Sequence, residues 1–261
     1  MSGSEVVEPA GRPSTAVERA GGQAPAPNRR ARARAAMRSE IKETALELMR
    51  DQGTPDVRFS DIARAMGLTA PALYRYYGNR DDLLTELIAD AFDDLAAYLA
   101  AAAAEVPVTD LGVRLFATCT AYRRWASAEP LRFALVFGVP VPGYTAPDQG
   151  PTTEAATRAM ANLANLVGLA AEQGVLRRPL ISEVGAGFEC DAGASAKAGK
   201  FGTAIPPDTH QAMLHAWAAL HGFTCLEAYG HLNWLAEPAR DDLFAGQVRL
   251  AALAAGLPPP P

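Results

Sequence analysis

Tyrosine and arginine are concentrated in one short stretch, where Tyr74, Arg75, Tyr76 and Tyr77 are followed by Arg80. Three tyrosines in four residues are unusual for a segment that only fills a helical core. Phenol hydroxyls and guanidinium groups are common donors to the phosphate oxygens of nucleic acids. The composition of this stretch therefore favours contact with a nucleic-acid backbone. The alternative is an ordinary helical hairpin whose tyrosines are buried.

The apolar residues around this stretch are spaced as in two short helices joined by a tight turn. The residues that would close a small core between the helices are Ile62, Ala63, Met66, Leu68 and Leu73. Gly67 stands where the first helix must end, and glycine tolerates the left-handed backbone common at that point. A helix-turn-helix of this kind places its second helix in the major groove of DNA.

Start signals mark the helices on either side of the tyrosines. Thr69 is a good N-cap, and Pro71 falls in the first turn of the next helix, where its missing N–H costs nothing. Asn79 is suited to cap a further helix, and the two aspartates after Arg80 place negative charge at that helix's N-terminus. The signals predict one helix over 70–77 and a longer one from residue 80.

This segment resembles the DNA-binding module of the TetR family of transcriptional regulators. The matching residues are Ile62-Ala63, Gly67-Leu68-Thr69, Leu73-Tyr74-Arg75-Tyr76-Tyr77 and Asn79-Arg80-Asp81-Asp82-Leu83. The resemblance implies a sequence-specific regulator that binds a double-stranded DNA operator. We interpret it as a repressor released by a small-molecule effector.

The resemblance also implies which side chains meet the bases. The start of the recognition helix would face the groove floor, through Thr69, Ala70, Pro71, Ala72 and Tyr74. Ala70 departs from the longer polar residues often found there and offers only apolar contact. Specificity would then fall partly on Ser60, on Arg75 and on the shape of the DNA.

By the same resemblance, Tyr74, Tyr76 and Arg80 would hold phosphates, whereas Tyr77 would face the core. Arg58 is a second departure, because the family commonly has serine or threonine there as a helix cap. Arginine caps poorly but could reach a phosphate. The basic run over residues 29–34 would lie along the DNA backbone, enter the minor groove, or simply serve solubility.

The charges are distributed unevenly along the 261 residues, a length that can hold two modest domains. Residues 29–80 carry eleven Arg and Lys against six Asp and Glu, a net charge of +5. Residues 81–261 carry eleven against twenty, a net charge of −9. A basic module on an acidic body suits a protein that touches phosphate with one end only.

We predict an all-α chain in three parts: a disordered tail over 1–28, a helix-turn-helix domain over 29–80, and a helical ligand-binding and dimerisation domain over 81–257. Apolar periodicity and Pro/Gly breaks predict helices over 36–52, 59–66, 70–77, 80–104, 109–127, 130–137, 152–173, 207–235 and 240–255. The Gly- and Ala-rich stretch 183–206 is either disordered or functional, and we favour disorder.

A second, shorter resemblance lies in the C-terminal half. Trp217, His221 and Gly222 match the Trp-x-x-x-His-Gly pattern of one subgroup of TetR-type C-terminal domains. It implies a regulatory domain that forms a homodimer. The helices over 207–235 and 240–255 are the expected dimer faces, and a dimer would read two half-sites.

Aromatic residues of the middle helices are candidates for the wall of an effector pocket, with plain core packing as the alternative for each. They are Phe116, Tyr122, Trp125, Phe133, Phe137, Trp217 and His221. Such a lining suits a small, largely apolar ligand.

Catalytic and metal chemistry find little support in the sequence. The three cysteines form no Cys-x-x-Cys pair, and no two of the four histidines are three or four residues apart. The segment 193–200 has the wrong glycine spacing for a phosphate-binding loop, and Phe201 replaces its Ser or Thr. We therefore expect no metal, no cofactor and no enzymatic activity. The alternative is a helical small-molecule-binding or enzymatic protein with a non-functional helix-turn-helix.

The apolar runs are too short to span a bilayer, and the N-terminus has no apolar signal-peptide core. We expect a cytoplasmic protein without a membrane partner.

Overall fold

The computed structural model describes residue 1 and residues 29–147, 149–190 and 205–261. The proposed tail over 2–28 and most of the stretch 183–206 lie outside these residues. Within the described ranges all regular elements are helices, which confirms the all-α prediction. They are α1 (Arg29–Gln52), α2 (Phe59–Ala65), α3 (Ala70–Leu73), α4 (Arg80–Ala104), α5 (Leu111–Ala128), α6 (Pro130–Phe137), α7 (Pro151–Glu172), α9 (Pro207–Ala228) and α10 (Glu237–Ala254).

Three helix boundaries differ from the predictions by four residues or more. α1 begins at Arg29 instead of residue 36, because an Arg- and Ala-rich run has high helix propensity and needs no apolar face to be helical. α3 ends at Leu73, and Tyr74 and Tyr76 lie in the turn that follows. α9 ends at Ala228 instead of 235, and Gly230 with a φ of 78° lies in the turn that follows.

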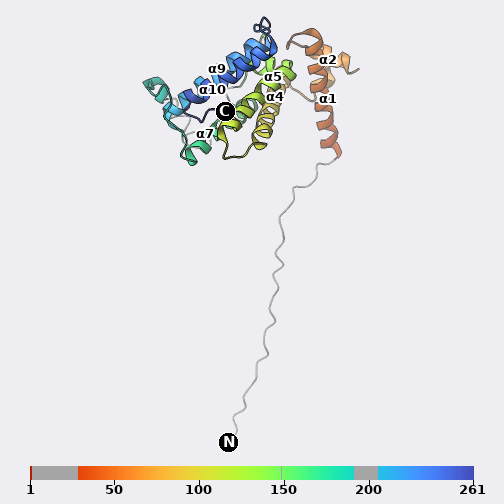
Figure 1. Ribbon diagram of the computed structural model, residues 1–261. Coiled ribbons are helices and arrows are strands. Elements are labelled where there is room, and N and C mark those ends of the chain that lie inside the picture. Colours follow the sequence, from red (N-terminus) through yellow and green to blue (C-terminus); the bar gives the residue numbers. More distant parts are fainter. Residues whose placement is uncertain (2–28, 148, 191–204) are drawn as a thin grey trace.

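The N-terminal helices share a core of their own. Figure 1 shows α1 and α2 at one end of the molecule, beside the larger helical bundle. The buried side chains of this core come from α1 to α4 and include Ile41, Ala45, Met49, Ile62, Leu73, Leu83, Leu84 and Leu87. The second half of α6 also enters it, through Leu135 and the following Val141.

The long helix α4 belongs to both the N-terminal core and the larger helical bundle. Its first turns pack into the N-terminal core, whereas Leu95 and Leu99 lie in a separate cluster with Trp125 and Phe133. Tyr98 of the same helix, by contrast, is 44% exposed. α4 packs most extensively against α7 and then against α5. A single rigid helix therefore connects the two cores.

The C-terminal body is a bundle of α5, α7, α9 and α10 around a third core, which contains Leu115, Val167, Leu220 and Phe244. The final residues pack back onto α5, where a Cβ atom on Gly112 would lie 2.5 Å from the carbonyl oxygen of Pro259. In the described parts of the chain, no helix is long and apolar enough to cross a membrane.

Candidate nucleic-acid interface and internal cavity

The turn between α2 and α3 has the expected backbone geometry. Gly67 has a φ of 65°, the left-handed conformation that glycine adopts without strain. Thr69 occupies the N-cap position of α3 in an extended conformation, but its side chain makes no capping hydrogen bond. Arg58 likewise precedes α2 without capping it. By contrast, the Asn79 side chain accepts a hydrogen bond of 2.8 Å from the Asp82 amide and caps α4 as predicted.

The predicted DNA-binding residues lie on the outside of this module or are partly exposed. Arg58, Ser60, Thr69, Pro71, Tyr74 and Arg75 are exposed, and Ala70, Ala72, Tyr76 and Arg80 are half-buried. Tyr74 is 56% exposed, and its ring lies against Phe59 with centroids 5.2 Å apart. The ring is therefore held in place, while its hydroxyl makes no hydrogen bond among the described residues.

Tyr77 faces the core, as expected, and is 2% exposed. The Arg38 guanidinium lies over its ring at 4.2 Å and donates a hydrogen bond of 2.8 Å to the Tyr76 carbonyl oxygen. Arg34, one turn earlier on α1, lies 5.5 Å from the centre of the Tyr76 ring. The basic end of α1 is thus placed beside the end of the recognition helix. The basic run over residues 29–34 is part of α1.

Ion pairs fix α1 to α4 behind this surface. Glu86 accepts hydrogen bonds from Arg38 and, at 3.1 Å, from Lys42, which also pairs with Asp90 at 2.5 Å. Burial alone would raise the pKa of Glu86, but the hydrogen bonds from Arg38 and Lys42 outweigh it and lower that pKa. The cluster stabilises the orientation of the recognition helix, because Arg38 binds the end of that helix as well.

We expect Glu86→Gln to lower the free energy of unfolding at neutral pH by about 1–2 kcal/mol, since two charge-assisted hydrogen bonds weaken. The folded pKa lies below the unfolded value of about 4.3. The stabilisation is therefore complete above that pH and is lost as the pH falls through the folded pKa. Urea unfolding between about pH 7 and pH 3 should show a smaller loss for the variant than for wild type. Glu47→Gln, an exposed change on α1, should leave the wild-type profile unaltered.

Arg80 has a structural role that the sequence did not indicate. Its Nε donates to the Val57 carbonyl oxygen at 3.0 Å, and an Nη atom pairs with Asp56 at 2.6 Å. The side chain thus joins the start of α4 to the segment before α2. A phosphate would have to share this guanidinium with Asp56. Arg34, Arg58 and Arg75, by contrast, form no ion pair with the described residues, so their charges are free for an external anion.

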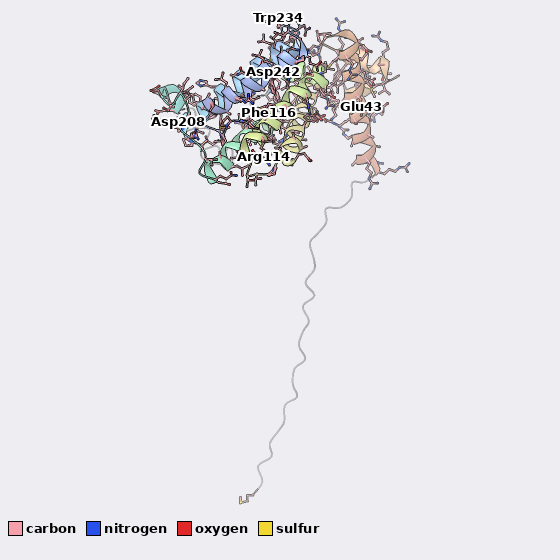
Figure 2. All side chains as sticks on the ribbon, viewed as in Figure 1. Glu43, Arg114, Phe116, Asp208, Trp234 and Asp242 are labelled. Carbon is pink, nitrogen blue, oxygen red and sulfur yellow. The ribbon has the colours of Figure 1, made fainter. Side chains whose placement is uncertain are left out.

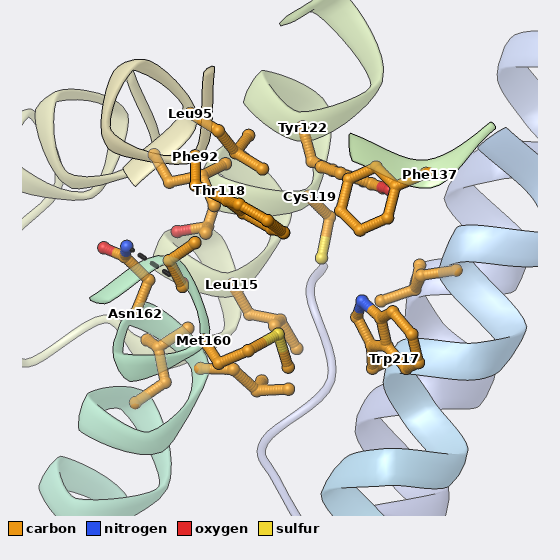
Figure 3. A pocket seen from close by; sticks show the side chains of 15 residues that line it. Phe92, Leu95, Leu115, Thr118, Cys119, Tyr122, Phe137, Met160, Asn162 and Trp217 are labelled. Atoms are coloured by element: carbon orange, nitrogen blue, oxygen red, sulfur yellow. Dashed lines mark hydrogen bonds between the residues drawn. The ribbon is translucent and has the colours of Figure 1, made fainter. Parts of the chain in front are cut away.

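A partly open cavity of about 90 Å³ lies between α4, α5, α7 and α9, and Figure 3 shows its walls. Three of the predicted pocket residues line it: Tyr122, Phe137 and Trp217. The remaining wall is formed by Phe92, Leu95, Leu99, Leu115, Thr118, Cys119, Ala159, Met160, Asn162, Leu163, Leu166 and Leu220. The contribution of α7 could have been found from its apolar residues at helical spacing over 159–166.

The other four predicted pocket residues do not line the cavity. Trp125 and Phe133 are buried in the core beside it, and the Trp125 indole donates to Asp94 at 2.7 Å. Phe116 packs against Phe244 of α10 and does not line the cavity. His221 lies behind the wall. These aromatic side chains pack against other parts of the protein. Residue type alone does not distinguish such packing residues from residues that line a ligand cavity.

His221 supports two wall residues from behind. Its Nδ1 lies 2.7 Å from the Tyr122 hydroxyl, and its ring stacks on Trp217 with centroids 5.2 Å apart. Burial lowers the pKa of His221 and raises that of Tyr122, so both are neutral near pH 7. Burial also raises the pKa of the Cys119 thiol to about 12. The titratable groups in and behind the wall are therefore uncharged.

The comparisons with known proteins agree with this architecture. Residues 41–87 match the model of bacterial regulatory proteins of the tetR family, and residues 115–251 match that of the tetracyclin repressor-like C-terminal domain. An HTH-type transcriptional regulator of Mycobacterium tuberculosis is 37% identical over 115 residues, which are 44% of this chain and 49% of that protein. The chain thus spans about half the length of the curated relatives it matches.

Solved structures extend the likeness over most of the chain. The regulatory protein SCO4313 is 33% identical, with a TM-score of 0.65, over 84% of this chain and 97% of that one. A tetR family transcription regulator from Shewanella sp. PV-4 shares the fold at 19% identity, with a TM-score of 0.54 over 82% and 96% of the two chains. A helix-turn-helix joined by a long helix to a helical bundle defines a class of bacterial regulators. The chain belongs to the TetR family, which is a family of transcriptional regulators and not a class of enzymes.

Proposed function

We propose that this protein is a sequence-specific DNA-binding regulator that represses transcription until a small molecule enters the cavity. The observation that carries the proposal is the exposed face of α2 and α3, where Arg58, Tyr74 and Arg75 are free of internal ion pairs. A recognition helix needs such unoccupied donors, because phosphates and base edges are both acceptor-rich. The α1–α4 ion pairs hold this face in a fixed orientation.

A homodimer formed through α9 and α10 is part of the proposal. Both helices have apolar side chains on their outer faces, with Leu226, Leu243, Leu250 and Leu253 between 47% and 57% exposed. Trp234, in the turn that joins the two helices, is 78% exposed (Figure 2). Two such helices from each protomer would bury these side chains in a four-helix interface with twofold symmetry. The dimer would then present two recognition helices to two half-sites.

Two helices could couple the cavity to the DNA-binding face. α4 lines the cavity through Leu95 and Leu99 and enters the N-terminal core through Leu84. α6 places Phe137 in the cavity wall and Leu135 in the N-terminal core. If these helices have two arrangements, a ligand that binds one more tightly shifts the equilibrium toward it. DNA affinity can then change by no more than the difference in the ligand's affinity for the two arrangements. Small tilts would change the spacing of the two recognition helices, and DNA binding would weaken.

Arginine substitutions on the DNA-binding face should have two distinct effects. Arg58→Gln should weaken binding to all DNA sequences alike and lower the slope of log K against log salt by about one unit, as expected for a lost phosphate contact. Arg75→Gln should mainly reduce discrimination between the operator and altered operators. Fluorescence anisotropy with labelled duplexes from the upstream region measures both effects. Arg178→Gln, an exposed change in the C-terminal body, serves as the control.

A different pattern would contradict this assignment. If Arg58→Gln altered affinity for a single operator base and left the salt slope unchanged, Arg58 would not be a phosphate contact. If neither Arg58→Gln nor Arg75→Gln differed from wild type, the exposed face of α2 and α3 would not be the DNA-binding surface.

A further inference from the structure

The internal cavity has no charged side chain in its wall. Its lining consists of apolar side chains together with Thr118, Tyr122 and Asn162 and the indole of Trp217. An ionised ligand group would lose its hydration there and gain no partner of opposite charge. The wall therefore selects for uncharged molecules.

The polar groups of the wall are mostly occupied by the protein itself. The Thr118 hydroxyl donates to the Arg114 carbonyl oxygen at 2.8 Å, and the Tyr122 hydroxyl is bound to His221. The Asn162 amide group donates to the carbonyl oxygens of Ala96 and Ala159 at 3.4 Å and 3.3 Å. These hydrogen bonds leave little donor capacity for a ligand.

The Trp217 indole N–H is the exception. It forms no hydrogen bond with any described residue, and Figure 3 shows the indole nitrogen on the side of the ring that faces Cys119 across the cavity. The ring stacks on His221 at an interplanar angle of 9°, and the Tyr122 hydroxyl holds His221 in turn. The N–H direction is therefore fixed before a ligand arrives. An apolar ligand would leave this donor without a hydrogen-bond partner in the occupied cavity.

We propose, building on the effector role proposed above, that the ligand is an uncharged, mainly hydrocarbon molecule with a hydrogen-bond acceptor that binds the Trp217 N–H. Ketone, ester, lactone and ether oxygens fit this description. Carboxylates and ammonium ions do not, since the wall offers them no counter-charge. Trp217 is the residue that determines this specificity.

Three probes of similar size separate the effect of ligand charge from that of a hydrogen-bond acceptor. Acetophenone is neutral and has a carbonyl acceptor, benzoate is its charged counterpart, and ethylbenzene has no acceptor. Binding is followed on the full-length protein by the methyl NMR signal of Met160, which lines the cavity and is assigned through Met160→Leu. Because Met160 lies in the cavity wall, its methyl signal distinguishes a probe bound in the cavity from a probe bound elsewhere on the protein. Trp217→Phe removes the donor and keeps an aromatic ring.

Acetophenone should shift the Met160 signal saturably, and benzoate should bind at least about tenfold more weakly near neutral pH. Trp217→Phe should weaken acetophenone binding by about two- to tenfold more than it weakens ethylbenzene binding. Retained ethylbenzene binding also shows that the variant keeps its folded cavity.

The inference is overturned if benzoate binds the cavity as tightly as acetophenone, if acetophenone does not bind, or if Trp217→Phe affects acetophenone and ethylbenzene equally. These titrations contain no DNA. If acetophenone filled the cavity without weakening DNA binding, the effector role would be contradicted while the ligand class would stand.

Discussion

Replacing Leu73 by alanine should destabilise the N-terminal domain by about 2–5 kcal/mol and abolish DNA binding at ordinary temperatures. Leu73 is the only buried residue of α3, and its side chain is fully inaccessible among residues of α1, α2 and α4. α3 is too short to be stable without this contact. The cavity left by the substitution removes the contact that holds the recognition helix on the module.

Urea unfolding followed by circular dichroism gives the loss of stability for Leu73→Ala, and a mobility-shift assay gives the loss of DNA binding. Leu180→Ala is the matched control, because Leu180 is 76% exposed and the change should cost less than about 0.5 kcal/mol. A Leu73→Ala protein with wild-type stability would show that the core of the helix-turn-helix is wrongly assigned.

Replacing Arg123 by methionine should destabilise the C-terminal body by about 3 kcal/mol, because it leaves a carboxylate largely buried without its partner. The Arg123 and Glu227 side chains are only 16% and 13% exposed, and two parallel hydrogen bonds join them. These bonds raise the pKa of Arg123, and a third bond of 2.7 Å to Asp241 adds to the effect. The pair thus links α5 to α9 and α10.

The double variant Arg123→Met, Glu227→Met should regain most of the lost stability, because no unpaired charge remains. Thermal and urea unfolding of the two single variants and the double variant measure this coupling. If the double variant were as unstable as the sum of the single variants, the loss would come from packing against Phe244, whose ring lies 4.9 Å from the Arg123 guanidinium, and not from the ion pair.

The helix-turn-helix could be predicted from the sequence because its signals are local. Gly67, Pro71 and Asn79 each impose a backbone conformation or a cap on their immediate neighbours, and the structure confirms each of them. The start of α1 could not be predicted from apolar periodicity, because the stretch over 29–35 has no apolar face, although helix propensity alone favours a helix there.

The cavity wall could be predicted only in part. Trp125 and Phe133 lie on the same helices as wall residues, and a small rotation of α5 or α6 decides which aromatic ring meets the cavity. That rotation depends on packing between segments far apart in the sequence. The same holds for Arg80, whose partners Asp56 and Val57 belong to the segment before α2. No local pattern specifies such contacts.

The most direct test of the central claim is to select bound sequences from a pool of random double-stranded DNA with the full-length protein. The account predicts enrichment of an inverted repeat, whose two half-sites are read by the two recognition helices of a dimer. The enrichment should disappear with Leu73→Ala and persist with Leu180→Ala. A pool that stays random under conditions where the protein is folded and dimeric would contradict sequence-specific DNA binding.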